Sequence, residues 1–70
     1  MDENQELLMD YFIALGATRM ELMYLMALLY YPPAAQDMIN YIADTGEKEL
    51  AKLMSIASKI YAKYPEEDDL

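Results

Sequence analysis

Apolar residues recur along this chain at helical spacing, and prolines, glycines and threonines separate the segments in which they do so. The clearest pattern comes late, where spacings of three and four residues relate Leu50, Leu53, Ala57, Ile60 and Tyr64. Such spacing places side chains on one face of a helix. Valine is absent and no alternation typical of a strand persists. The pattern predicts an all-α fold, a compact bundle of four short helices at about residues 4–15, 18–31, 33–44 and 47–64.

The predicted helix boundaries follow from local residue chemistry. Thr18 and Glu21 form the T-x-x-E pattern of a capping box at the start of the second helix. Pro32 disfavours a helical conformation in the residue before it, so this helix is expected to end there. Pro33 suits the first position of the third helix, where a missing N–H costs nothing. Gly46 separates the third helix from the fourth.

The second predicted helix contains ten consecutive apolar residues, Leu22–Tyr31. A membrane-spanning helix needs about 20 such residues, so a membrane span is not expected. We expect this helix to be central in the bundle. Three short helices cannot readily cover all of its sides, and large exposed apolar patches normally mark interfaces. The pattern therefore favours a homodimer, although coverage within one chain stays open as the alternative.

Methionine and tyrosine are unusually frequent, with seven of each in 70 residues. Methionine adapts its shape at binding surfaces, and tyrosine combines an apolar ring with a polar tip. Plain core packing would also account for both residues. If they form an interface, the expected members are Phe12, Met20, Met23, Tyr24, Ala27, Tyr30 and Tyr31.

The formal net charge of −8 changes the picture of possible partners. Binding to nucleic acid depends largely on Lys and Arg, so we expect no nucleic-acid partner. A helix-turn-helix regulator remains an alternative because the first two helices have a suitable connection, but the charge disfavours it. A second alternative is an acidic mimic of nucleic acid that inhibits a basic protein.

Candidate chemistry is sparse. The chain has no cysteine and no histidine, which removes thiolate ligands and the commonest general base. Ser55 and Ser58 lack an activating partner, and the two glycines form no phosphate-binding loop. We therefore expect no catalytic, cofactor-binding or metal-binding residues, no small-molecule substrate and no enzymatic activity.

The domain organisation is expected to be simple. Residues 1–64 are predicted to form one helical domain, and residues 65–70 (PEEDDL) an acidic, frayed tail. The first residues, MDENQE, lack the basic region of a signal peptide, so a cytoplasmic protein is expected. The prediction is a small non-enzymatic interaction or regulatory protein that pairs with itself, binds a protein partner through a Met/Tyr-rich helix face, or does both.

Overall fold

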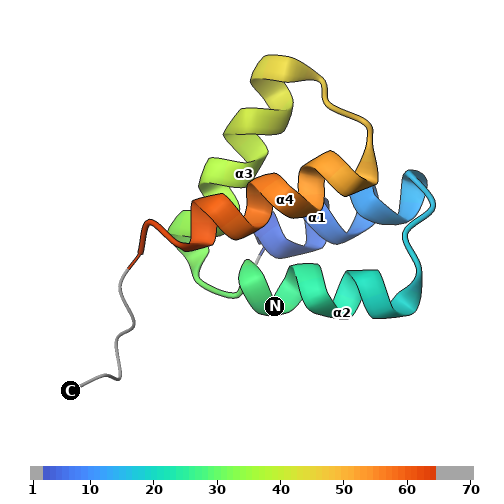
Figure 1. The fold of residues 1–70 in the computed structure, drawn as a ribbon, viewed down its shortest axis with the longest axis horizontal. Helices are drawn as coiled ribbons and strands as arrows, with labels where there is room; N and C mark the ends of the chain where they lie inside the picture. The colour runs from blue at the N-terminus through green and yellow to red at the C-terminus, as the bar shows by residue number, and fades with distance from the viewer. Residues whose placement is uncertain (1–2, 65–70) are drawn as a thin grey trace.

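The computed structural model describes residues 3–64 and contains four helices within them. They are α1 (Glu3–Ala14), α2 (Arg19–Leu28), α3 (Pro32–Thr45) and α4 (Leu50–Tyr61). The predicted all-α bundle is confirmed, while the predicted acidic tail at 65–70 lies outside the described residues. In Figure 1, α1, α2 and α4 run along the long axis of the molecule, whereas α3 rises across it.

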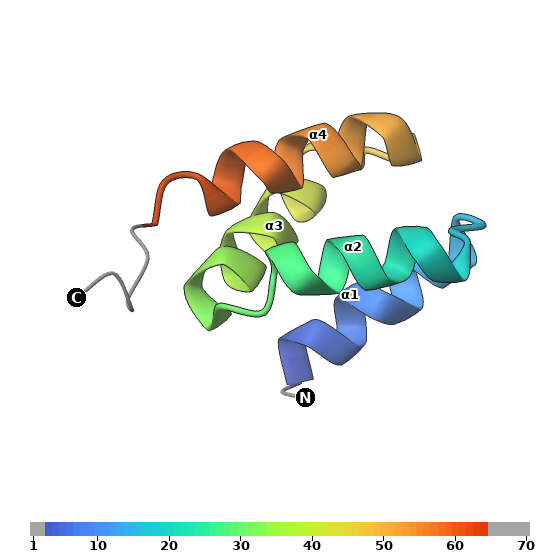
Figure 2. The same ribbon diagram turned by 60° about the horizontal axis from the view of Figure 1, so that its bottom comes forward.

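The main helix contacts join α1 to α2 and α3, and α4 to the same two helices. The core fills the space between the four helices with Leu8, Phe12, Leu25, Leu29, Ala34, Ala35, Met38, Leu53, Ala57 and Ile60. Figure 2 shows α2 between α1 and α4. α2 makes its main contacts with these two helices and is not enclosed on every side. Within its bounds, α2 buries Leu25 alone, because it packs along one side only.

The start of α2 is the capping box that the sequence predicts. The Thr18 hydroxyl oxygen accepts a hydrogen bond from the backbone N–H of Glu21 at 3.1 Å. In return, the Glu21 carboxylate accepts one from the backbone N–H of Thr18 at 2.8 Å. Two N–H groups without an intrahelical partner are thus satisfied.

The end of α2 comes earlier than predicted, at Leu28 rather than residue 31. Tyr31 has an extended backbone with ψ of 120°, as expected for a residue before proline, and α3 begins at Pro32 rather than at residue 33. Gln5 ties this turn to α1, since its side-chain N–H donates to the carbonyl of Leu29 at 3.1 Å. Leu29 remains fully buried although it lies outside the helix.

The fourth helix is also shorter than predicted, at Leu50–Tyr61 instead of 47–64. Before it, the Thr45 hydroxyl accepts from the N–H of Glu47, and the Glu47 carboxylate accepts from the N–H of Glu49. Such side-chain bonds compete with helix formation, so this linker stays outside the helix. After Tyr61 the chain continues in a tighter turn, with the N–H of Tyr64 donating to the Tyr61 carbonyl.

Candidate interaction surface

The outer side of α2 is apolar and faces away from the core. Met20, Met23 and Ala27 follow a spacing of three and four residues and are all exposed. Tyr24 adjoins them and is also exposed, and Tyr30 continues the surface just beyond the helix. We call these five residues the α2 face. The ribbon of α2 lies along the lower edge of the four helices in Figure 1.

Two predicted interface residues lie elsewhere. Phe12 is fully buried, because it shares the inner side of α1 with Leu8, four residues before it. It is a core residue rather than part of an exposed surface. Tyr31 is half-buried at the border of the α2 face, where its ring meets the ring of Tyr64 edge-on at 5.2 Å.

The α2 face is bordered by polar contacts but carries little charge of its own. The Tyr24 hydroxyl lies 3.4 Å from the hydroxyl of Ser58 on α4, at hydrogen-bonding distance. No charged residue occurs between Glu21 and Asp37. Arg19 and Glu21 stand at the first turn of α2, and Glu21 is engaged in the capping box. The exposed apolar side chains therefore adjoin one another without an intervening charge.

A polar cluster beside Tyr31 attaches the end of α4 to α3. The Tyr64 hydroxyl donates a hydrogen bond to the Asp37 carboxylate, and the Lys63 ammonium lies 3.6 Å from the same carboxylate. The bond to Asp37 raises the pKa of Tyr64, with further contributions from desolvation and from the negative charge of Asp37. This cluster positions the ring against which Tyr31 packs.

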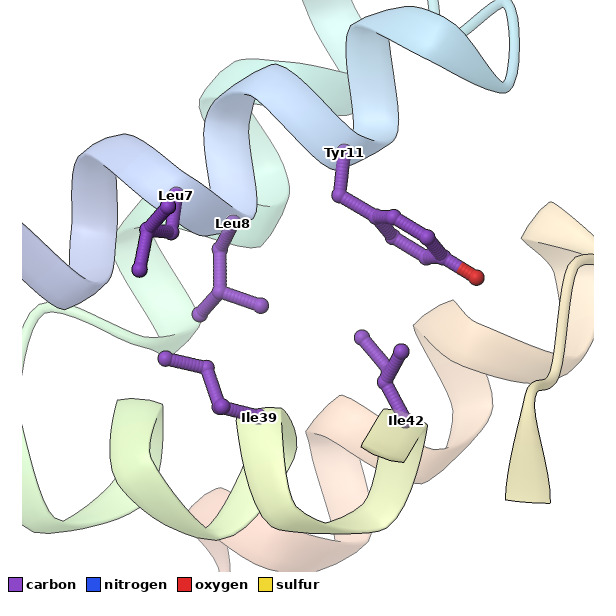
Figure 3. Close-up of a pocket in the computed structure, with 5 residues that line it drawn as sticks. All are labelled: Leu7, Leu8, Tyr11, Ile39 and Ile42. Atoms are coloured by element: carbon purple, nitrogen blue, oxygen red, sulfur yellow. The ribbon is translucent and has the colours of Figure 1, made fainter. Parts of the chain in front are cut away.

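A second apolar surface was not predicted from the sequence. It is a groove between α1 and α3 of about 220 Å³, lined by Leu7, Leu8, Tyr11, Ile39 and Ile42. Figure 3 shows the side chains of α1 projecting across the groove toward the two isoleucines of α3. Four of the five lining residues are aliphatic, and the fifth is a tyrosine. The sequence carries no signal for a gap between them, because the gap depends on the inclination of α3.

Other kinds of site receive no support from residues 3–64. No helix in this range is long and apolar enough to cross a membrane. In the same range, no three acidic, histidine or cysteine side chains gather closely enough to hold a metal ion. Comparisons with family models, curated proteins and solved structures give no match.

Proposed function

We propose that this chain is a small non-enzymatic interaction protein that forms a homodimer through the α2 face. One observation carries this proposal: five neighbouring residues, Met20, Met23, Tyr24, Ala27 and Tyr30, are apolar and exposed. Contiguous apolar patches of this kind normally mark a contact with another macromolecule.

The lack of charge on the α2 face favours a second copy as the partner. A basic partner gains no electrostatic attraction from an uncharged surface. A second copy presents the same uncharged apolar face, so the two faces can pack together without burying a charge. In a two-fold symmetric dimer the same patch serves both subunits. The net charge of −8 opposes association, but its acidic groups lie outside the stretch from Leu22 to Gln36. Their repulsion is therefore not concentrated at the contact.

The size of the α2 face limits the strength of this dimer. α2 has ten residues, which corresponds to a length of about 15 Å. Specific, stable interfaces usually bury about 800 Å² on each partner, more than one face of so short a helix supplies. We therefore expect a dissociation constant in the micromolar range and a dimer that comes apart on dilution.

The residues of the α2 face also disfavour sequence-specific binding of DNA by α2. Arg19 is the only cationic residue of this helix, and the exposed positions that follow it are apolar. Base edges and phosphates are contacted mainly through hydrogen bonds and cationic side chains. The α2 face offers few of either, which supports a protein contact instead.

Light scattering coupled to size-exclusion chromatography tests the dimer. The mass should rise from the 8.1 kDa of one chain toward twice that value as the protein concentration increases through the micromolar range. Met23→Lys should keep the protein monomeric, because Met23 is 63% exposed at the middle of the α2 face and an interfacial ammonium would be desolvated. Circular dichroism should show unchanged helicity.

The matched control is Leu7→Lys, since Leu7 is 57% exposed but lies on α1. This variant should dimerise as the parent chain does. A parent chain that stays monomeric at several hundred micromolar would refute the dimer. Equal disruption by the two lysine substitutions would place the contact elsewhere.

A further inference from the structure

The groove between α1 and α3 is a second surface, independent of the α2 face. Leu8 is buried at its base, while Leu7 stays largely exposed at its edge. In Figure 3 the ribbons of α2 and α4 lie behind the two helices that form the groove. All five lining residues belong to α1 and α3, so a dimer through the α2 face does not involve them.

Two hydrogen bonds mark the ends of the groove, one from α1 to α3 and one from α1 to the linker that follows α3. At one end, the Asn4 side-chain amide donates to the side-chain carbonyl of Gln36 at 2.9 Å. At the other, the Tyr11 hydroxyl donates to the backbone carbonyl of Glu47 at 2.6 Å. Asn4 and Tyr11 are seven residues apart, which corresponds to about 10 Å along a helix. The apolar stretch between them therefore matches about two helical turns of a partner.

The volume of the groove indicates what kind of ligand fits. Pockets for small molecules usually enclose about 300–1,000 Å³, and this groove has about 220 Å³. It lies open between two helices rather than enclosed. These dimensions suit a few apolar side chains that a larger molecule inserts, as in recognition of an amphipathic helix by a groove.

The charged residues of the two helices that form the groove are all acidic. Glu3 and Asp10 stand four residues before and three residues after Leu7, so they share its side of α1, and both are exposed. Neither α1 nor α3 contains a lysine or an arginine. A partner segment with cationic flanks would therefore meet attraction here, and one with acidic flanks would meet repulsion.

We propose that this groove binds a basic amphipathic helix of a partner protein. Apolar side chains of that helix insert between Leu7 and Ile39, and its lysines or arginines lie against Glu3 and Asp10. The apolar contacts supply most of the affinity, and the acidic rim selects for positive charge and accelerates association.

Synthetic peptides test the proposal on the full-length protein. The probe is an amphipathic helical peptide with leucines on one face and lysines on the other. One control replaces the lysines by glutamates, and a second replaces the leucines by serines. Fluorescence anisotropy should show binding of the probe that weakens several-fold when salt is raised from about 50 to about 300 mM. Both control peptides should bind at least about tenfold more weakly.

Two substitutions on α1 locate the binding site. Leu7→Ser should weaken binding about tenfold, because an apolar contact at the groove edge is lost. Ile13→Ser is the matched control: Ile13 is 52% exposed on the same helix, but six residues further along and hence on another side. It should change affinity less than about twofold. Circular dichroism should confirm that both variants remain helical.

Two further variants distinguish the contribution of the acidic rim, formed by Glu3 and Asp10, from that of the α2 face. Glu3→Gln combined with Asp10→Asn should reduce both the affinity at low salt and its salt dependence. Met23→Lys should leave peptide binding unchanged, which keeps this proposal separate from the dimer. NMR shift changes should centre on Leu7 and Ile39.

Several results would overturn the proposal. Equal binding of the glutamate or serine peptide would remove the specificity argued from charge and shape. Equal loss in Leu7→Ser and Ile13→Ser, or shift changes confined to the α2 face, would place the site elsewhere. Concentration-dependent shifts at Leu7 and Ile39 in the protein alone would show that a second copy occupies the groove. No detectable binding at millimolar peptide would also refute it.

Discussion

α2 and α4 are similar in length and both rich in apolar residues, yet the fold uses them differently. α4 buries Leu53, Ala57 and Ile60 and exposes its lysines. α2 has the longer apolar run but buries Leu25 alone within its bounds and leaves Met20 and Met23 exposed. The difference shows that the arrangement of apolar residues, rather than their number, decides which of them reach the core.

The physical reason lies in the polar residues. The lysines of α4 must remain in water, so they fix which side of that helix faces inward. α2 has no charged residue after its first turn, so several orientations would bury a similar apolar area. Its neighbours α1 and α4 select the orientation, and the surplus apolar surface stays outside.

The largest expected effect on stability distinguishes the buried side of α2 from its exposed side. Leu25→Ala should lower the free energy of unfolding by about 2–5 kcal/mol, as core Leu→Ala substitutions do. Leu53→Ala on α4 should fall in the same range, because both side chains are fully buried. Met23→Ala should cost less than about 0.5 kcal/mol at protein concentrations low enough to exclude dimers.

Urea unfolding followed by circular dichroism measures all three variants. Because a 70-residue chain is marginally stable, the two leucine variants are best compared at low temperature. A loss for Met23→Ala as large as that for Leu25→Ala would show that α2 is covered on both sides, contrary to the structure.

A smaller effect compares the starts of the two helices. Thr18→Ala should cost about 1 kcal/mol, because the α2 capping box loses a bond to the backbone N–H of Glu21. Glu49→Ala should cost only a few tenths of a kcal/mol, since the Glu49 side chain makes no capping bond and its ion pair with Lys52 is exposed. Thermal unfolding of both variants provides the comparison, and a reversed order would contradict it.

The smallest expected effect concerns alkaline pH and the end of α4. The pKa of Tyr64 is raised in the folded chain, so folding favours its protonated form. The resulting stabilisation is complete below the ordinary tyrosine pKa of about 10 and is lost as pH rises through the raised value. Urea unfolding at pH 8 and at pH 11 should show this loss in the parent chain and a smaller loss in Tyr64→Phe.

The control for this effect comes from α2, where Tyr24 faces Ser58 rather than a carboxylate. Tyr24→Phe should retain the alkaline loss of the parent chain. An identical pH dependence in the parent chain and Tyr64→Phe would show that the bond to Asp37 does not couple folding to this proton.

Most of the fold follows from local sequence chemistry. The capping box of Thr18 and Glu21, the extended residue before Pro32 and the left-handed Gly46 at the end of α3 all lie where the sequence indicates a boundary. The predicted boundaries are wrong where a contact with a distant residue, or a competing hydrogen bond, determines the local structure. α4 begins at Leu50 rather than at residue 47, because the side chains of Thr45 and Glu47 bond to backbone N–H groups within the preceding linker.

The candidate surfaces likewise include one that the sequence predicts and one that it does not. Exposure of Met20, Met23, Tyr24, Ala27 and Tyr30 agrees with the predicted interface, but whether another chain covers them stays a prediction. Phe12 is expected at the interface but is buried in the core, and only contact with neighbouring helices shows which part of the wide apolar surface of α1 faces inward. The groove at Leu7 and Ile39 leaves no signal in the sequence, because a gap between helices depends on how they incline.

The sequence alone determined the number of helices, where α2 begins and which side of α4 faces inward, because backbone geometry, capping bonds and the hydration of charges act over a few residues. The tertiary structure decided which side of α2 stays exposed and that a gap remains between α1 and α3. Both depend on how whole helices incline and pack against one another. The local pattern of apolar and polar residues does not specify this packing.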